Sequence, residues 1–328
     1  MKVYILYHSP CWDGAMAAAI VKSAMDMYPE NMFDTSYIPF NYAEGLTKEF
    51  KDEVSRPCEE PRSIHLLDIS FDIGNSKHKE DLLFLCELSS IHYLLLSNRA
   101  PTIDWWDHHE SSRESIQWLK DNYINHNIDI VFSTEDSGAK ITFKKLNFTF
   151  GETVVNYISD FDTWKFEHAN TKAFIAGLRA SDHGYPTLEN ACKVLAYDSA
   201  KIEELINQGN NELKRQEKIF QAFSRSAFGI RLAHQDFVAC SYGDKASVSE
   251  FSEYLYTKYK LPSFIFSIQP KGVGLSFRSN EELGEILWAA KQFNGGGHKY
   301  AAGGFTSIED FATLMKNSSF KFDGDNNA

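Results

Sequence analysis

The sequence predicts an α/β protein with a parallel-sheet N-terminal domain and a smaller α/β C-terminal domain, joined by a helical connector. Short apolar runs alternate with helix-forming segments over the first half of the chain, and short β-like runs return after a long amphipathic stretch. In addition, 328 residues exceed the usual size of one hydrophobic core. We therefore expect two domains, each with its own core.

The N-terminal domain is expected to begin with a strand, a turn and a helix. Residues 2–7 are β-branched or aromatic, and residues 15–21, which follow Asp13-Gly14, are strong helix formers. Short polar residues at 136–139 predict a helix cap. Further apolar runs, separated by helical or loop-like segments, predict parallel strands with crossover connections at residues 64–69, 91–96 and 102–106.

A connector and a second domain follow. The apolar spacing over residues 199–228 predicts one long amphipathic helix or two short ones. Short β-like runs then occur at residues 237–241, 263–268 and 274–278, before a helical stretch at 281–293. We place the N-terminal domain at 1–195, the connector at 196–228, the C-terminal domain at 229–320 and a frayed tail at 321–328.

The composition argues against several classes of partner. A net charge of −12 would repel a long phosphate backbone, so long duplex nucleic acid is not expected to bind. No window approaches the ~20 apolar residues of a membrane helix, and the N-terminal apolar run is too short for a signal peptide. Five scattered cysteines without a Cys-x-x-Cys pair argue against a disulfide framework. We expect a cytoplasmic protein in a reducing compartment.

Two adjacent imidazoles follow a carboxylate at the end of an expected strand, in the order Asp107-His108-His109. Alone, a His-His pair would be interpreted as part of a surface loop. The chain offers further potential metal ligands, which are His8, Cys11, Asp13, Asp68 and Asp162. In parallel sheets, bound molecules and ions lie beyond the carboxyl ends of the strands, where His8, Asp68 and Asp107 are expected. These donors suit manganese, iron, cobalt or zinc, so the sequence favours metal-assisted phosphoester cleavage.

Four short motifs occur in a defined order, and a fifth lies in the C-terminal domain. The first four are residues 8–14 (HSPCWDG), 67–70 (LDIS), 107–109 (DHH) and 160–164 (DFDTW), and the fifth is 294–305 (NGGGHKYAAGGF), with 276–279 (SFRS) upstream. In this order they resemble the DHH superfamily of metal-dependent phosphoesterases, joined to the DHH-associated C-terminal domain of nanoRNase-type and RecJ-like enzymes. The resemblance spans nearly the whole chain.

The resemblance implies two divalent ions that share Asp68. Its ligand sets would be His8, Cys11 and Asp68 for one ion, and Asp13, Asp68, His108 and Asp162 for the other. A water activated by both ions would attack the phosphorus in line. His109 would donate a hydrogen bond to a phosphate oxygen, and Asp107 would orient His108. Asp162 matches the motif better than Asp160, which would cap or support; both are expected in a turn after a helix.

The first motif departs from the usual family pattern. Cys11 stands where the family has an aspartate, two residues ahead of the retained Asp13. In this respect the chain is similar to a branch of the superfamily with a Cys-x-Asp-Gly motif. Manganese is the usual family metal and the one expected here, although a thiolate shifts the preference toward zinc, iron or cobalt. Coordination by Cys11 and simple packing of its side chain both remain open.

The glycine run of the fifth motif predicts a binding site for an anion. Gly295-Gly296-Gly297 can adopt positive φ and let backbone N–H groups approach an anion closely, whereas a plain flexible loop is the alternative. The resemblance makes this a substrate site. Arg278 would supply a bidentate fork for a phosphate, and His298 would supply a second donor.

The resemblance favours a phosphodiesterase that hydrolyses short single-stranded oligonucleotides or linear dinucleotides to 5′ mononucleotides, with the substrate between the domains. The alternatives are a cyclic nucleotide or cyclic dinucleotide phosphodiesterase and a nucleotide-binding regulatory protein with weak turnover. A pyrophosphatase fits the C-terminal motif less well. Trp105, Trp106 and Trp164 flank the motifs and either stack a base or belong to the core. An oligomer is compatible with the sequence.

Overall fold

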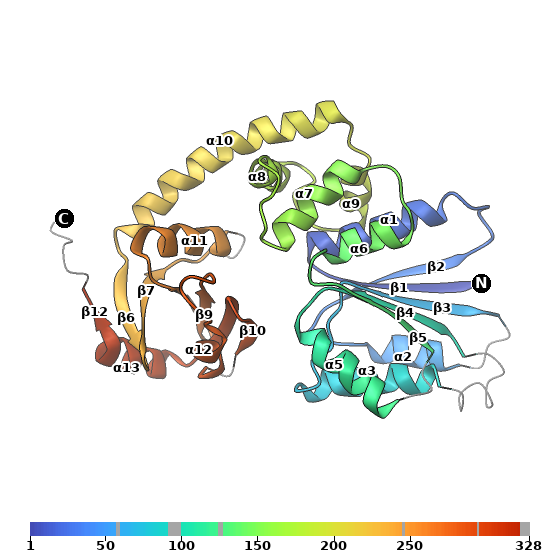
Figure 1. Ribbon diagram of the computed structural model, residues 1–328, viewed down its shortest axis with the longest axis horizontal. Coiled ribbons are helices and arrows are strands. Elements are labelled where there is room, and N and C mark those ends of the chain that lie inside the picture. The colour runs from blue at the N-terminus through green and yellow to red at the C-terminus, as the bar shows by residue number, and fades with distance from the viewer. Residues whose placement is uncertain (57–59, 91–99, 124–126, 245–246, 294, 322–328) are drawn as a thin grey trace. The chain divides into compact units, whose positions relative to one another are not determined.

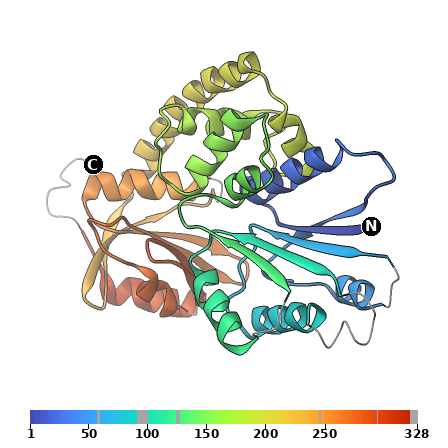
Figure 2. The ribbon, with the colours of Figure 1, turned by 45° about the vertical axis from the view of Figure 1, so that its right-hand side comes forward.

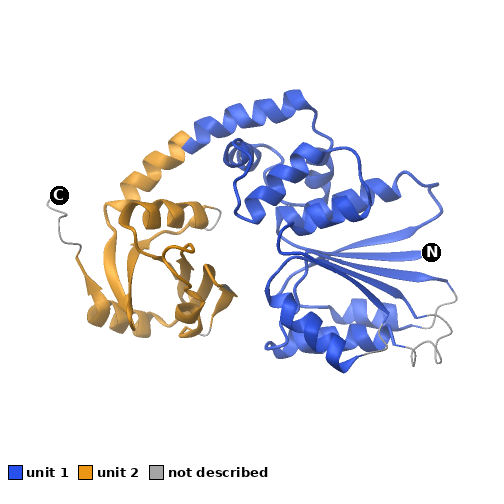
Figure 3. Cartoon of the chain, in the orientation of Figure 1, with its two compact units in different colours: residues 1–213 blue, residues 214–328 orange. Residues whose placement is uncertain are grey.

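The computed structural model describes residues 1–56, 60–90, 100–123, 127–244, 247–293 and 295–321, without the side chain of His298. The chain divides into two compact units, Met1–Leu213 (unit 1) and Lys214–Ala328 (unit 2) (Figure 3). It passes from one unit to the other within α10 (Ser199–Ser224). A single helix thus occupies the stretch for which the sequence predicts one long helix or two short ones.

Unit 1 contains a five-stranded sheet in the order β2-β1-β3-β4-β5, in which all strands are parallel. The strands are β1 (Lys2–His8), β2 (Asp34–Phe40), β3 (Arg62–Leu67), β4 (Thr102–Asp107) and β5 (Ile128–Phe132). The strands expected at residues 2–7, 64–69 and 102–106 are confirmed, although β3 ends before Asp68. The run at residues 91–96 lies outside the described part of the chain.

Helices cover both faces of this sheet, as Figures 1 and 2 show from two directions. One layer consists of α1 (Trp12–Met25), α6 (Gly138–Lys145), α7 (Glu152–Asp162), α8 (Thr171–Ala180) and α9 (Leu188–Leu195), and the other of α2 (Lys48–Ser55), α3 (Ser76–Leu88) and α5 (Ser111–Asn122). Along β1, Val3, Ile5 and Tyr7 face the first layer, whereas Tyr4 and Leu6 face the second. A strand buried on both faces explains the nearly continuous apolar runs.

Unit 2 contains a seven-stranded mixed sheet in the order β10-β11-β9-β8-β7-β6-β12. Its strands are β6 (Phe228–Leu232), β7 (Gln235–Ser241), β8 (Ser263–Gln269), β9 (Gly272–Arg278), β10 (Gly296–His298), β11 (Ala301–Thr306) and β12 (Ser319–Phe320). Among the described strands of this second sheet, only β7 and β8 pair in parallel. The strands expected at residues 237–241, 263–268 and 274–278 are confirmed.

The helices of unit 2 also pack on both faces of their sheet, and they are α11 (Val248–Tyr259), α12 (Leu287–Lys291) and α13 (Ile308–Ser318). Phe237 of β7 belongs to the core under α12 and α13, while Val238 belongs to the core under α11. The helix expected over residues 281–293 is wrong in length. Gly284 has a φ of 87°, which no α-helix accommodates, so the helix begins only at Leu287. None of the described helices has the length and apolarity needed to cross a membrane.

Candidate metal centre

The ends of three neighbouring strands bring potential metal ligands to one edge of the sheet in unit 1. His8 is the last residue of β1, Asp68 directly follows β3, and His108 and His109 directly follow β4. Because β1, β3 and β4 are adjacent and parallel, their carboxyl ends lie side by side. The three strand ends meet around Asp68.

The backbone at Asp68 turns its side chain into this meeting point. Asp68 has a φ of 59°, a left-handed conformation that aspartate tolerates better than most residues. Its N–H donates to the carbonyl of Trp106 over 3.0 Å, which ties the turn to β4. Only 1% of Asp68 is exposed. The carboxylate is therefore fixed within the protein rather than free to rotate in solvent.

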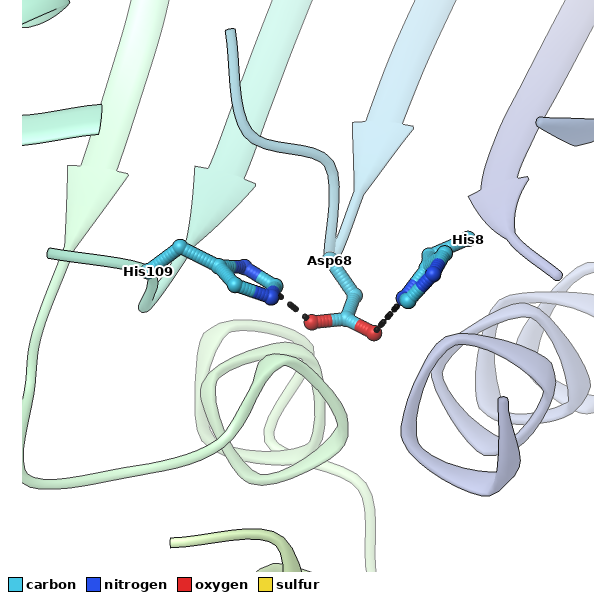
Figure 4. A group of neighbouring side chains, drawn as sticks. All are labelled: His8, Asp68 and His109. Carbon is cyan, nitrogen blue, oxygen red and sulfur yellow. Dashed lines mark hydrogen bonds and ion pairs between the residues drawn. The ribbon is translucent and has the colours of Figure 1, made fainter. Parts of the chain in front are cut away.

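The first group of potential ligands consists of His8, Asp68 and His109, whose donor atoms lie within 4.8 Å of one another. Figure 4 shows the two imidazoles on either side of the carboxylate. His8 Nδ1 is 3.3 Å from Asp68 Oδ2, and His109 Nδ1 is 3.7 Å from Asp68 Oδ1. His109 thus occupies the place in this group that the resemblance gives to Cys11.

The second group consists of Asp13, Asp68 and His108, again with donor atoms within 4.8 Å of one another. His108 Nε2 is 3.1 Å from Asp68 Oδ1 and 3.9 Å from Asp13 Oδ2. The same nitrogen is 3.2 Å from Asp162 Oδ2, so a third carboxylate reaches this group. Asp68 belongs to both groups, and each of the two groups includes one residue from the loop after β4.

The N-terminal end of α6 orients Asp13. Its Oδ1 atom accepts hydrogen bonds from the Ser137 hydroxyl and, over 3.0 Å, from the backbone N–H of Ala139. Its Oδ2 atom is buried and accepts no hydrogen bond from any residue that the structure describes. Buried carboxylate oxygens normally have partners. An unpartnered oxygen that faces His108 and Asp68 is what a bound cation would satisfy.

The carboxylates of the second group carry more negative charge than the protein around them compensates. Burial, together with the charges of Asp68 and Asp162, raises the pKa of Asp13 well above its usual value. Burial and the charge of Asp68 likewise raise the pKa of Asp162, although His108 opposes the shift. A divalent cation would remove this repulsion, so the electrostatics fit a metal as well as the donor set does.

The imidazoles around Asp68 compensate its negative charge. Burial alone would raise the pKa of Asp68, but the adjacent imidazoles of His108 and His8 lower it far below its usual value. In turn, the bond to Asp68 and the charges of Asp162 and Asp13 outweigh burial and raise the pKa of His108 well above its usual value. A proton on His108 therefore stands in for part of the positive charge that a cation would bring.

Asp107 contacts His109 and not His108, which corrects the orienting role predicted from the motif. Asp107 Oδ1 lies 2.7 Å from His109 Nδ1, and the Ser112 hydroxyl donates to Asp107 Oδ2. Burial disfavours the His109 imidazolium, but the charge and hydrogen bond of Asp107 raise its pKa to about 9. The His108 ring instead turns its Nε2 atom toward the carboxylates of Asp68 and Asp162.

Cys11 stands at the start of α1 beside the second group. It is the N-cap residue of this helix, is partly buried and has a free thiol. Burial and the charges of Asp68, Asp162 and Asp13 raise the pKa of the thiol well above its usual value. The thiol is therefore close enough to feel the three carboxylates, while it belongs to neither group of ligand atoms.

Asp160 and Asp162 both lie in the last turn of α7, and not in a turn after the helix as expected. Residues two positions apart on a helix point in different directions. Asp162 points to His108, whereas Asp160 accepts hydrogen bonds from the N–H groups of Glu167 and His168 over 2.8 and 3.1 Å, and from the Thr171 hydroxyl. One carboxylate faces the centre and the other supports the following loop.

These placements predict opposite results for two substitutions. We expect Asp160→Ala to lower the free energy of unfolding by about 2–3 kcal/mol, because it leaves partly buried donors unpaired. We expect Asp162→Ala to leave stability nearly unchanged without metal and to weaken Mn²⁺ binding at least about tenfold, because it removes a carboxylate from the centre. Urea unfolding and calorimetric Mn²⁺ titration measure the two effects. Weak Mn²⁺ binding in the Asp160 variant alone would contradict this assignment.

Gly138 lets α6 approach the centre. A Cβ atom at this position would lie 2.7 Å from Asp68 Cβ and 2.9 Å from Asp13 Oδ2. We expect Gly138→Ala to displace both carboxylates, to destabilise the protein by about 1–3 kcal/mol and to weaken Mn²⁺ binding. The matched control is Gly243→Ala, since a Cβ there would meet no atom within 4 Å. Equal Mn²⁺ affinity in both variants would show that the close approach does not matter.

Sequence reasoning missed the side chains that hold the ligands in place. The helix cap expected at residues 136–139 is confirmed, since α6 begins there with Ser137 as its N-cap, but its contact with Asp13 has no local sequence signal. Tyr42 was also missed. Its ring centroid is 4.8 Å from that of His8, and its hydroxyl accepts from the N–H of Ser70 over 3.0 Å. Trp105 and Trp106 are buried in the core.

Of the residues predicted to bind substrate in unit 2, Arg278 ends β9 and the glycine run leads into β10, with β11 between these two strands. Arg278 Nε donates to Ser249 Oγ over 3.3 Å, and Arg278 Nη1 donates to the Ala302 carbonyl over 3.2 Å. Two nitrogens of the guanidinium that was expected to bind a phosphate therefore already make hydrogen bonds within unit 2. Burial lowers the pKa of Arg278. The glycine run enters a strand and not a loop: a Cβ on Gly295 or Gly297 would lie 2.0 or 2.5 Å from a carbonyl oxygen of β11. Their role in binding an anion stays a prediction.

No protein-family model matches the chain, and no curated protein matches it. Similar solved structures include the DHH domain of a protein from a family of ribosomal proteins (TM-score 0.58, 13% identity, 96% of this chain and 85% of that one). An exopolyphosphatase-related protein from Bacteroides fragilis is similar over 96% and 90% of the two chains (TM-score 0.52, 15% identity). An exonuclease RecJ bound to manganese is similar over 96% and 88% (TM-score 0.50, 14% identity).

Proposed function

We propose that this chain, which has the fold of DHH-domain proteins, is a metal-dependent phosphodiesterase. The observation that carries the proposal is the position of Asp68 in two groups of potential ligands at once. Beside it lies the buried Asp13 Oδ2, which accepts no hydrogen bond from the described residues. A carboxylate shared by two sites, with excess negative charge around it, is the arrangement used by two-metal hydrolases.

Two divalent ions would be held by His8, Asp68 and His109 on one side, and by Asp13, Asp68, His108 and Asp162 on the other. When bound, such ions supply an activated water and neutralise charge on the phosphoryl oxygens. The oxygen and nitrogen donors suit manganese, and the similar exonuclease RecJ structure contains manganese. Cys11 as an additional ligand would shift the preference toward zinc, iron or cobalt.

The side chains around the centre have separate tasks in this proposal. Asp13 is held by Ser137 and Ala139, so its free oxygen keeps one orientation. Asp107 contacts the His109 ring at Nδ1 and raises its pKa, and an ion bound by His109 would displace the imidazolium proton. Whether His109 binds an ion or donates to a phosphate oxygen, its direction is set by Asp107 before the substrate arrives.

Short single-stranded oligonucleotides and linear dinucleotides are the proposed substrates, cleaved to 5′ mononucleotides. A net charge of −12 disfavours long nucleic acids, and one similar structure is an exonuclease. Arg278, the glycine run at 295–297 and His298 are proposed to bind the substrate phosphate or its terminus. Their donors are a guanidinium, backbone N–H groups and an imidazole, all of which suit an anion.

The test uses purified protein with Mn²⁺, Co²⁺, Zn²⁺ or Mg²⁺ and a panel of substrates: diadenylate, longer RNA, single-stranded DNA, cyclic mono- and dinucleotides, and pyrophosphate. We expect metal-stimulated release of AMP from diadenylate and slower cleavage of longer chains. Cleavage of cyclic substrates alone would show a cyclic nucleotide phosphodiesterase instead. Binding of nucleotides without metal-stimulated cleavage of any substrate would show a binding protein and refute the proposal.

A further inference from the structure

We propose that Trp164 stacks a nucleobase of the substrate, on a loop that Asp160 fixes at the metal centre. This inference rests on the proposed function and adds to it a preference for substrates that carry a base near the scissile phosphate. The loop consists of residues 163–170, between α7 and α8. None of its side chains belongs to the two groups of potential metal ligands in the described chain.

The loop begins at the metal centre. Asp162, the last residue of α7, has its Oδ2 atom 3.2 Å from His108 Nε2. Trp164 follows two residues later and is half-buried. Its N–H donates to the Phe161 carbonyl over 3.2 Å, so the helix end and the loop form one hydrogen-bonded turn. The indole is therefore attached to the same turn as a carboxylate of the centre.

Asp160 fixes the remainder of the loop. Its carboxylate accepts from the N–H groups of Glu167 and His168 and from the Thr171 hydroxyl, and its carbonyl accepts from the N–H of Lys165 over 3.1 Å. Hydrogen bonds thus hold the first half and the middle of the loop, and they also tie Asp160 to the first residue of α8. A loop held in this way is ordered before a ligand binds, which lowers the entropy cost of binding.

Two residues of the loop have strained backbone conformations. Trp164 has a φ of 57° and Phe166 a φ of 53°, which is unusual for bulky side chains. Such strain persists only where the surrounding structure enforces it, and it clusters at ligand-binding segments. Here it brings the two rings together, with centroids 4.8 Å apart and planes at 71°.

Cations cover the other two rings of the cluster. Lys172 Nζ lies 4.3 Å from the ring centroid of Phe166, and Arg179 Cζ lies 4.9 Å from that of Phe161. Phe161 also packs edge-on against Trp164, with centroids 5.3 Å apart. Of the three rings, the indole offers the largest π-surface, and aromatic stacking on it would accept any base.

The test compares diadenylate with two dimers of the same backbone, each lacking one adenine. We expect Trp164→Ala to raise KM for diadenylate about tenfold or more, as the loss of one stacked base does, with little change in kcat. For the dimer that lacks the stacked adenine, KM should be high in wild type and should not rise further in the variant. Trp164→Phe should retain most of the affinity, because a phenyl ring still stacks.

Trp118→Ala is the matched control, because Trp118 is a half-buried tryptophan of α5 with Lys79 Nζ 5.5 Å from its ring. It should leave KM unchanged for all three dimers. An equal rise in KM for all three dimers in Trp164→Ala would overturn the inference, since it would indicate a role in folding or in positioning Asp162.

A binding experiment separates this inference from the proposed function. Calorimetry with AMP and with ribose 5-phosphate needs no turnover. We expect wild type to bind AMP more tightly than ribose 5-phosphate, and Trp164→Ala to lose most of this difference. If wild type cleaves no dimer but shows this Trp164-dependent preference, the proposed function fails and the inference holds. Equal AMP binding by wild type and Trp164→Ala would refute the inference whether or not the protein cleaves dimers.

Discussion

Asp68→Asn is expected to lower kcat/KM for diadenylate at least about 10³-fold in the presence of Mn²⁺. Removal of one preorganised hydrogen-bond donor from an active site typically costs about 10²–10³-fold in rate, and here the lost carboxylate belongs to both groups of potential metal ligands. The amide keeps the size of the side chain, so packing around the 1% exposed site changes little. Initial rates and a calorimetric Mn²⁺ titration of the variant measure the effect.

Asp81→Asn is the matched control. Asp81 is equally buried, but its carboxylate accepts from the N–H of Leu46 over 2.9 Å and pairs with Lys51 Nζ at 2.6 Å, away from the metal centre. This variant should lose stability and keep its Mn²⁺ affinity. An Asp68→Asn protein that keeps wild-type activity with Mn²⁺ would refute the shared role of Asp68.

Divalent metal is expected to stabilise the protein, and the gain should grow as the pH rises. An ion at a hundredfold excess over its dissociation constant adds about 3 kcal/mol, which corresponds to a rise in Tm of about 5–10 °C for a unit of this size. The ion binds carboxylates and neutral imidazoles, and therefore competes with the protons on Asp13, Asp162 and His108. Metal binding should release protons at neutral pH.

The direction of the pH effect follows from the shifted groups. The folded-state pKa values of Asp13 and Asp162 are raised, so without metal their burial costs stability as the pH rises above about 4, the unfolded value. The raised pKa values of His108 and His109 stabilise the folded state below about pH 6.5, and this contribution is lost as the pH rises through the folded values, about 9 for His109. Stability contributed by the lowered pKa values of Asp68 and Asp107 is lost only in acid.

The measurement is the Tm of wild type at pH 6.5 and pH 8.5, with EDTA and with Mn²⁺. The Tm of the metal-free protein should be lower at pH 8.5 than at pH 6.5. The rise in Tm caused by Mn²⁺ should be larger at pH 8.5. Asp68→Asn serves as the variant that should respond little to Mn²⁺ at either pH. A Tm gain that is larger at pH 6.5 would contradict the protonation states described for His108 and Asp13.

The fold was largely predictable because its signals are local. Each strand of unit 1 that was expected and is described has a short apolar run, and burial on both faces makes such runs conspicuous. The error at residues 281–293 arose where an apolar helical pattern was interrupted by Gly284, whose φ of 87° a pattern of apolar residues does not reveal.

The sequence predicted which residues lie at the metal centre better than it predicted which of their side chains contact one another. His8, Asp68 and His108 follow strand ends, which topology places together. The partner of Asp107 depends on which way two adjacent imidazoles turn, and the run Asp107-His108-His109 is compatible with either. Local sequence likewise does not tell which glycines allow close packing, as in the strand that contains Gly297.

The arrangement of unit 1 also determines when its ion-binding groups can form during folding. Asp13 is oriented by Ser137 and Ala139, more than a hundred positions further along the chain, and the last carboxylate comes from Asp162. Contacts of such long sequence separation form slowly, after local structure. Truncated chains that end before α7 would lack one donor, so ion affinity should report that the whole of unit 1 has reached its native state.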